Sequence, residues 1–280
     1  MPQQLTFTVC QRWTHRKARY RPAGEVFDPS RYGVEPLDGD TLAASFVREN
    51  HYSGSYPAAR YRVGLFCTSP FARPELVGVA VFSEPIQQAS IPHWTGLPPR
   101  QGTDLGRLIL REDVKAMAES WFMARAFSLL RKAKPDLRAV IAYCDPLPRL
   151  DADGHEVKRG HIGTVYAALN ATYRGRARPR TLLLAPNGTV LSERTLSKLK
   201  ADDKGRDYAE RELRALGAPA RLATESGAAY LARALAALPL RRWRTKGNHV
   251  FVWPLGPDAK LLRAQWTSLP RPLVPDRLAA

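Results

Sequence analysis

The feature that most constrains the fold is a strand–helix–strand succession between residues 105 and 146. The runs LGRLIL (105–110) and RAVIAYCDP (138–146) are short and apolar, which is typical of buried strands. The segment between them, 118–135, has apolar residues at helical spacing and is ended by Pro135. These apolar residues are Trp121, Phe122, Ala126, Leu129 and Leu130. The succession indicates strands of one sheet, joined by a helix that covers a face of it.

A hairpin precedes this succession, and more strands follow it. YRVGLFC (61–67) and ELVGVAVFSEP (75–85) are valine-rich strands joined by a loop that contains prolines. PRTLLLAP (179–186) and NHVFVWPLG (248–256) are later strands, with helical patterns between them. A hairpin early and strand–helix–strand units late predict an α/β (α+β) fold, a mixed sheet with helices on both faces.

We expect one main domain with flanking segments. Residues 1–40 are a basic N-terminal extension with a first strand at 5–10, and residues 257–280 are a proline-rich tail. Residues 41–256 form the single domain, with a helical insertion at about 201–238.

The charge of the chain predicts a polyanionic partner. Its 43 Lys and Arg residues outnumber its 26 Asp and Glu residues, which gives a net charge of +17. Such an excess attracts nucleic acid, an anionic membrane or a phosphorylated small molecule. A GC-rich genome would explain arginine in place of lysine but not the imbalance against acids. The charge therefore favours nucleic acid.

Cysteine usage predicts a reducing, cytoplasmic environment. Cys10, Cys67 and Cys144 are odd in number and far apart, so they form neither a disulfide framework nor a zinc site. We expect no signal peptide and no membrane partner, because no run reaches the roughly 20 apolar residues of a membrane span. Nothing in the sequence indicates an oligomeric state.

The stretch NHYSG (50–54) follows a predicted helix that begins after Asp40. His51 and Tyr52 are reactive side chains at an element end, so the stretch is a candidate active-site loop. The structural alternative is that His51 caps the helix, since imidazolium suits a helix C-terminus, while Tyr52 only packs.

Glu119 and Ser120 begin the long helix, after the strand that carries Arg107. The start of a helix offers free N–H groups and the positive end of its dipole to an anion. The alternative is that both residues only cap the helix, since they are favoured there.

An acid and a glycine-rich helix start form the third candidate site. Asp145 closes a buried strand, and in sheets of this kind ligands bind at the carboxyl ends of strands. GHIGTVY (160–166) follows it, with His161, Gly163, Thr164 and Tyr166 in reach. Glycine lets the backbone approach a ligand, but the GK[ST] ending of a phosphate loop is absent. The alternative is a helix cap with His161 on the surface.

The stretch YRGRARPR (173–180) is a candidate nucleic-acid contact. Arginines beside an aromatic ring suit phosphate contact and base stacking. The residues are Tyr173, Arg174, Arg176 and Arg178. The alternative is a solvated loop.

These stretches together resemble the Mom family of phage DNA-modification proteins. The resemblance is carried, in order over roughly 45–255, by NHYSG, LVGVAVFSEP, LGRLILREDV, ESWFMARAF, VIAYCDP, GHIGTVYAALNATYRGR, PRTLLL, LSK and GNHVFVW. It implies a GNAT-like acyltransferase fold and an enzyme that places a methylcarbamoyl (acetamido) group on N6 of adenine in DNA. This modification protects phage DNA from restriction, so the expected place of action is the host cytoplasm.

The resemblance also implies roles for particular residues. The family's chemistry corresponds here to His51, Tyr52, Arg107, Ser120, Asp145 and Tyr166. We expect Glu119, His161, Gly163 and Thr164 to help bind substrate or donor. The fold admits a CoA thioester as donor, but acyl transfer would give an N-acyl product, whereas the family's product is joined through a CH₂ carbon. Iron held by His51, Tyr52 and Asp145 is one expected means of activation.

Two other functions compete with this interpretation. A conventional GNAT acetyltransferase would act on a protein or a small amine, but it needs a glycine-rich loop where REDVKAMAES (111–120) stands. A non-catalytic DNA-binding protein would explain the charge but not the reactive residues at strand ends.

Overall fold

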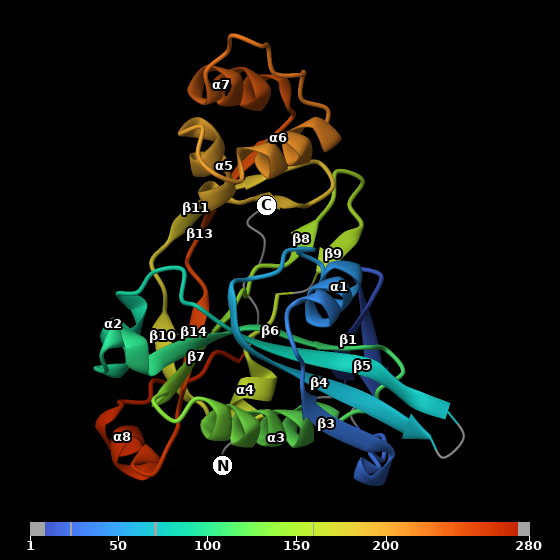
Figure 1. Cartoon of the computed structure of the whole chain (residues 1–280), viewed down its shortest axis with the longest axis vertical. Helices are drawn as coiled ribbons and strands as arrows, with labels where there is room; N and C mark the ends of the chain where they lie inside the picture. The colour runs from blue at the N-terminus through green and yellow to red at the C-terminus, as the bar shows by residue number, and fades with distance from the viewer. Residues whose placement is uncertain (1–8, 23, 70–71, 159, 274–280) are drawn as a thin grey trace. The chain divides into compact units, whose positions relative to one another are not determined.

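The chain divides into two compact units. The core unit contains residues 1–148, 158–177 and 248–280, and the inserted unit contains residues 149–157 and 178–247. The structure is a computed structural model that describes residues 9–22, 24–69, 72–158 and 160–273 (Figure 1). Most of the strand expected at 5–10 lies outside these ranges.

The core unit is built on a seven-stranded mixed sheet. Its strand order is β10-β14-β7-β6-β5-β4-β3, and every neighbouring pair is antiparallel except β6 and β7. The bounds are β3 Tyr32–Pro36, β4 Ala59–Ser69, β5 Ala72–Ser83, β6 Gly102–Leu110, β7 Ala139–Cys144, β10 Thr172–Arg176 and β14 His249–Pro254. The one parallel pair arises because α3 (Ala118–Ala133) connects β6 to β7 as a crossover.

Helices cover both faces of this sheet, as the sequence predicted. Val79 and Val81 of β5 pack with α1 (Thr41–Asn50), whereas Ala80 and Phe82 belong to the cluster that includes α3. Figure 1 shows α1 and α3 on opposite faces. The buried face of α3 follows the helical period, with Ala118, Phe122, Ala126 and Leu130 all 0% exposed. Burying one such large apolar side chain contributes about 1.5–3 kcal/mol.

The parallel strands β6 and β7 pair over only three residues each. Gly102, Thr103 and Asp104 pair with Ala139, Val140 and Ile141, after which no pairing between the two strands follows. Each strand continues along its other neighbour, β6 along β5 and β7 along β14. Arg107 therefore lies on β6 beyond the last paired residue, and Asp145 follows the end of β7.

Smaller elements complete the core unit. A hairpin of β1 (Val9–Thr14) and β2 (Lys17–Pro22) forms a separate sheet. The others are α2 Ser90–Thr95, α4 Thr164–Ala168, α8 Ala259–Gln265, and 3-10 turns Pro29–Arg31 and Pro99–Gln101. The boundaries differ from those that we expected at 40 and 257. β3 lies in the main sheet, and α8 packs Leu262 into a buried cluster. Within the described ranges, no helix is both long and apolar enough to cross a membrane.

The inserted unit has a core of its own and is larger than the predicted insertion at 201–238. It contains a sheet of order β12-β11-β13, helices α5, α6 and α7, and the short strands β8 and β9. The bounds are β8 Arg149–Leu150, β9 Glu156–Lys158, β11 Arg180–Leu184, β12 Val190–Leu191, α5 Glu193–Lys200, α6 Arg206–Ala215, α7 Gly227–Ala237 and β13 Arg241–Thr245. Ser192 caps α5 by accepting from the Thr195 N–H at 3.4 Å. Gly227 is required at the start of α7, because a Cβ there would lie 2.0 Å from the Leu199 carbonyl oxygen.

Candidate active site

The loop after α1 places His51 and Tyr52 beside a tryptophan. His51 is the C-cap of α1, and its backbone N–H donates to the Val47 carbonyl at 2.9 Å. The ring centroids of His51 and Tyr52 are 4.3 Å apart, and that of Trp13 lies 5.7 and 5.1 Å from them. His51 thus does cap the helix, but its ring is also part of a half-buried aromatic group.

Ser53 determines which nitrogen of His51 carries the proton. Its backbone N–H donates to Nδ1 at 3.2 Å, and its Oγ lies 2.8 Å from the same nitrogen. Since Nδ1 accepts, we assign the proton of the neutral ring to Nε2.

Arg107 ties this loop to β6. Its Nη2 donates to the Ser55 carbonyl at 2.8 Å, to Ser55 Oγ at 2.7 Å and to Ser53 Oγ at 3.2 Å. Burial lowers the pKa of the Arg107 guanidinium. Tyr52 and Tyr166 lie close enough to act in the opposite direction and raise it. A cation whose partners include neutral oxygens can still attract negative charge in a bound molecule.

Asp145 forms a buried ion pair that the sequence did not indicate. The ammonium of Lys158 lies 3.4 Å from Asp145 Oδ2 and donates to the carbonyls of Asp145 and Leu147 at 3.1 and 2.7 Å. Lys158 is 1% exposed and Asp145 8%. The backbone N–H of Leu147 also donates to Asp145 Oδ1 at 3.1 Å. Lys158 ends the short strand β9, and the polar sequence around it has no periodicity that would have pointed to this residue.

The segment before α4 brings His161 and Tyr166 to the same place. The His161 N–H donates to the Asp145 carbonyl at 3.1 Å. Burial, and then the charge of Lys158, lower the pKa of His161 to about 4. Burial raises the pKa of Tyr166 well above its usual range. Both groups are therefore uncharged at neutral pH.

Gly163 is the N-cap of α4, directly before Thr164, and no other residue fits there. Its φ is +75°, and a Cβ would lie 2.4 Å from the ring of Phe251. The glycine lets α4 approach β14. As a result the ring of Tyr166 packs against those of Phe251 and Trp253, with ring centroids 5.5 and 5.3 Å apart.

These side chains form one group, which we call the Tyr52–Tyr166 cluster. The Lys158 ammonium lies 5.9 Å from the centre of the Tyr52 ring, and the rings of His161 and Tyr166 are 6.3 Å apart. Tyr52 and Arg107 both influence the pKa of Tyr166. The members are His51, Tyr52, Arg107, Asp145, Lys158, His161 and Tyr166. Six of these seven were candidate site residues in the sequence.

Glu119 lies in a different environment from this cluster. Its carboxylate is paired with Arg12, which is 0% exposed and also donates to the carbonyls of Val114 and Lys115 at 2.8 and 2.6 Å. This geometry favours a structural role for Glu119. Ser120 is partly exposed in the first turn of α3.

The start of α3 does not fit the pyrophosphate of a CoA thioester. The Ala116 N–H donates to the carboxylate of Glu25 at 3.2 Å, and hydrogen bonding from Arg21 lowers the pKa of Glu25 to about 2. Glu119 adds a second carboxylate at this helix end. Each of these carboxylates is paired with an arginine, so the donors at this end of the helix are already engaged within the protein, and no step through CoA is derived.

The three expected iron ligands are not arranged to fit a metal. The Lys158 ammonium already neutralises Asp145, and Nδ1 of His51 is engaged by Ser53. A cation would have to displace Lys158 from the carboxylate, so we derive no step through iron.

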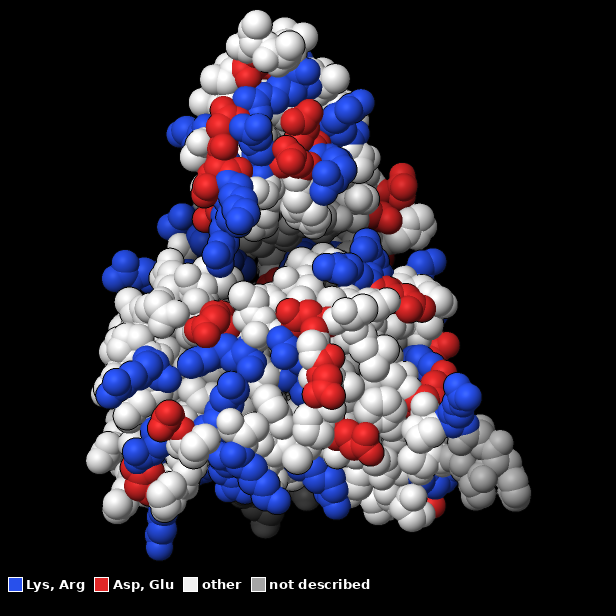
Figure 2. Space-filling view, in the orientation of Figure 1, with Lys and Arg blue, Asp and Glu red and all other residues white. Residues whose placement is uncertain are grey.

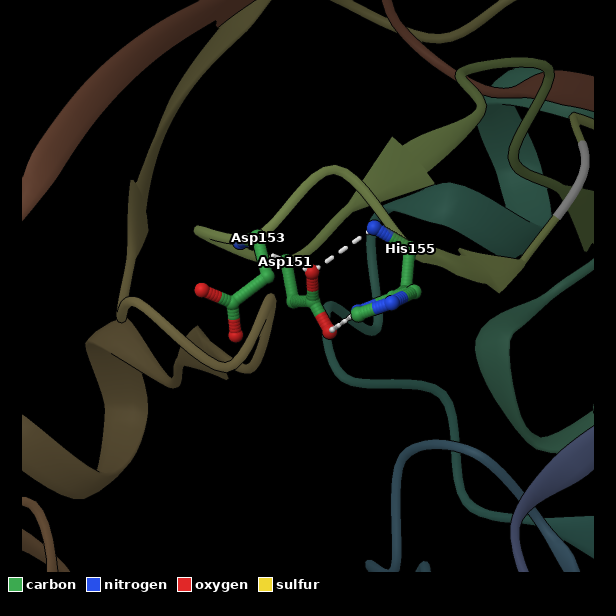
Figure 3. Close-up of side chains that lie close together, drawn as sticks. All are labelled: Asp151, Asp153 and His155. Atoms are coloured by element: carbon green, nitrogen blue, oxygen red, sulfur yellow. Dashed lines mark hydrogen bonds and ion pairs between the residues drawn. The ribbon is translucent and has the colours of Figure 1, made fainter.

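Asp151, Asp153 and His155 are the one group of three His, Cys, Asp or Glu residues in the described ranges with metal-like spacing. They lie in the inserted unit. Asp151 Oδ1 accepts the N–H groups of Asp153 and His155 at 3.0 and 2.8 Å, and the Asp153 carboxylate points away from the other two side chains (Figure 3). Asp151 therefore closes a turn.

The predicted nucleic-acid stretch is largely engaged inside the protein. The Tyr173 hydroxyl is buried and 2.7 Å from His249 Nδ1, and Arg174 donates to the carbonyls of Trp94 and Thr267 at 3.2 and 2.8 Å. Arg176 is half-buried, whereas Arg178 is exposed. The cause is that β10 pairs with β14, which draws these side chains into the sheet unit rather than leaving a solvated loop.

Comparison with solved structures returns a GNAT protein. The chain is similar to a "Tandem GNAT protein from the clavulanic acid biosynthesis pathway (without AcCoA)", at 10% identity and a TM-score of 0.40, covering 81% of this chain and 99% of that one. This likeness is too slight to carry an argument about fold or activity.

The family is established by sequence. The model of the Mom protein family matches residues 32–222, so the chain belongs to the Mom protein family. A search of curated proteins found no match. The matched segment includes every member of the Tyr52–Tyr166 cluster but not β13.

Proposed function

We propose that this protein is a transferase that places a methylcarbamoyl group on N6 of adenine in DNA. Its membership of the Mom family supports the class of reaction. The single observation that carries the proposal is the Tyr52–Tyr166 cluster, in which side chains from four separate segments meet where β6 and β7 part. A family of binding proteins would have no need of such a buried polar group.

Asp145 is the proposed proton acceptor. N6 of adenine must gain a bond to carbon and lose one proton, while the donor's bond to that carbon breaks and its electron pair stays with the leaving group. A buried carboxylate can accept that proton, and the positive charge of Lys158 favours its ionised form. Lys158 is thus a positioning residue, because it acts through Asp145.

Tyr166 and His161 are proposed to act as neutral groups. The raised pKa of Tyr166 keeps its phenol protonated, so it can donate a hydrogen bond to a developing negative charge. His161, with a pKa of about 4, stays neutral beside the charged Lys158.

The rings of Trp13, His51 and Tyr52 are proposed to receive the base. Chemistry on a base requires it to leave the stack, and an aromatic group offers a surface on which it can stack again. Arg107 holds this loop through Ser53 and Ser55, so it fixes the ring positions relative to Asp145.

Mass spectrometry of nucleosides tests the proposal. DNA from cells that express the protein should contain deoxyadenosine enlarged by one acetamido group. This DNA should resist cleavage by restriction enzymes whose recognition sites contain the modified adenines. DNA from cells expressing Tyr166→Phe, which keeps the ring, should lack the modification. An N-acetyl product would instead indicate a conventional acetyltransferase. Unmodified adenine with a well-folded protein would refute the reaction.

A further inference from the structure

Two neighbouring strands of the inserted unit carry six basic residues and no acid. We call residues 178–184 and 241–247, which contain β11 and β13, the β11–β13 ribbon. The basic residues are Arg178, Arg180, Arg241, Arg242, Arg244 and Lys246, and every one of them is exposed. Four of them stand around Trp243 in the run RRWRTK, which lies beyond the segment that matches the family model.

The pairing of the strands places these charges on both faces of the ribbon. Arg180 is opposite Thr245 and Thr181 is opposite Arg244, so basic residues from both strands meet at this end of the ribbon. Residues two apart on a strand are separated by about 6.8 Å. Because side chains alternate between the two faces, Arg242 and Arg244 line one face of the ribbon, whereas Arg180 and Arg241 line the other, where the guanidinium of Arg241 is 5.3 Å from the centre of the Trp243 ring.

The helices of the same unit show that this composition is specific to the ribbon. Residues 193–233 contain nine basic and seven acidic residues, several of them in ion pairs such as Arg221–Asp202 and Arg233–Glu225. In Figure 2 these helices, at the top, show red and blue side chains intermixed. The net positive charge of the inserted unit therefore comes from the ribbon.

We propose that the β11–β13 ribbon binds the phosphate backbone of the DNA substrate. This inference rests on the proposed function, which supplies DNA as the partner. Exposed arginines without acidic neighbours are the usual phosphate contacts, and their counterions are released on binding. A two-stranded ribbon is also a shape that DNA accommodates.

An alternative reason for these charges must be separated from the proposal. β13 pairs only with β11 in the described sheet, and basic residues on an edge strand prevent pairing with other chains. That reason predicts aggregation when the charges are removed, whereas phosphate binding predicts a loss of affinity and of salt dependence.

The test compares two variants of equal charge. The ribbon variant is Arg241→Gln, Arg242→Gln, Arg244→Gln and Lys246→Gln. The control carries Arg194→Gln, Lys200→Gln, Arg211→Gln and Arg214→Gln on the helices, where these residues are also exposed. Affinity for a duplex of 20 to 30 base pairs is measured over a range of salt concentrations. Each phosphate that the variant no longer neutralises lowers the slope of log K against log salt by about 1. Because Arg241 lies on the other face of the ribbon from Arg242 and Arg244, we expect a slope lowered by about two to three in the ribbon variant and unchanged in the control.

The outcomes distinguish this proposal from the proposed function. If both variants bind like the wild type, the ribbon proposal is overturned while DNA modification stands. If the wild-type protein binds no duplex, the ribbon proposal fails with its premise. A ribbon variant that aggregates in size-exclusion chromatography yet keeps its slope supports edge protection and overturns phosphate binding. The ribbon variant should melt within a few degrees of the control.

Discussion

Two buried ion pairs in the core unit have the same formal composition but different surroundings. Arg12 and Glu119 join the N-terminal hairpin to α3, and Arg12 uses its other donors on backbone carbonyls. The Lys158 ammonium lies 3.4 Å from Asp145 Oδ2. Tyr52 and His161 are neighbours of this pair, and both are close to Tyr166. The first pair is a fixed link between elements, whereas the second holds a carboxylate among neutral side chains that can bind a substrate. Burial of a charge therefore does not by itself identify an active site; its neighbours do.

The largest expected effect on stability comes from breaking the first pair. Arg12→Met leaves the Glu119 carboxylate buried without a cation, which should lower the free energy of unfolding by about 3–5 kcal/mol. Urea unfolding measures this loss, and Arg12→Met with Glu119→Leu should recover most of it. Modification per folded molecule should stay near the wild-type level. A loss of activity in the stable double variant would place Glu119 in donor binding after all.

A third buried carboxylate has no basic partner and sharpens the comparison. Asp104 is the last β6 residue paired with β7, and burial, then the charge of Glu84, raise its pKa to about 7. The folded state thus binds this proton more tightly than the unfolded chain, so stability falls as pH rises from about 4 to about 7 and is level above that. Asp104→Asn lacks this pH-dependent contribution. Its free energy of unfolding relative to wild type should therefore increase by on the order of 2 kcal/mol as the pH is raised from 5 to 8. Chemical denaturation at both pH values checks it; a difference independent of pH would contradict the assignment.

Asp145→Asn should separate chemistry from stability. The amide keeps an acceptor for the Leu147 N–H, and the backbone carbonyls still bind Lys158, but the buried ammonium loses its counter-charge, so the expected loss of stability is about 3 kcal/mol. Modification should fall by about 100-fold or more, because the proton acceptor is gone. Asp151→Asn is the matched control in an exposed turn. Thermal melting and nucleoside mass spectrometry measure the two effects, and an active Asp145→Asn would remove the carboxylate from the mechanism.

The smallest effect on stability is expected for Tyr52→Phe. The ring stays packed against Trp13 and His51, so the free energy of unfolding should change by less than about 0.5 kcal/mol. If the hydroxyl moves a proton or orients the substrate, modification is lost. A fully active Tyr52→Phe, combined with a fully active His51→Ala, would exclude this loop from the chemistry.

The sequence predicted the parts of this molecule that depend on local periodicity. The apolar spacing predicted a helix at 118–135 and strands at 105–110 and 138–146, close to the observed α3, β6 and β7, and the end of the second strand located Asp145. Family resemblance then grouped Asp145 with the other candidate residues. These are signals that a short window of residues contains.

The remaining parts depend on contacts between distant segments. Arg12 and Glu119 are 107 residues apart, and neither has a local pattern that names its partner. Lys158 ends the three-residue strand β9, whose polar sequence has no periodicity, and the burial of Tyr173 follows only from the pairing of β10 with β14. The run RRWRTK is the exception, because four basic residues around a tryptophan are a local signal, as visible in the sequence as YRGRARPR.

The short pairing of β6 with β7 has a mechanical consequence. The seven-stranded sheet consists of two groups of strands, β3–β6 and β7–β14–β10, which pair with each other through only three residue pairs. The ladder between β4 and β5, in contrast, extends over most of both strands. A ladder of three pairs opens at a lower free-energy cost than a full ladder. Amide hydrogens along it should therefore exchange with solvent before those inside either group of strands. The groups proposed to carry out the chemistry thus lie on both sides of the shortest ladder in the sheet.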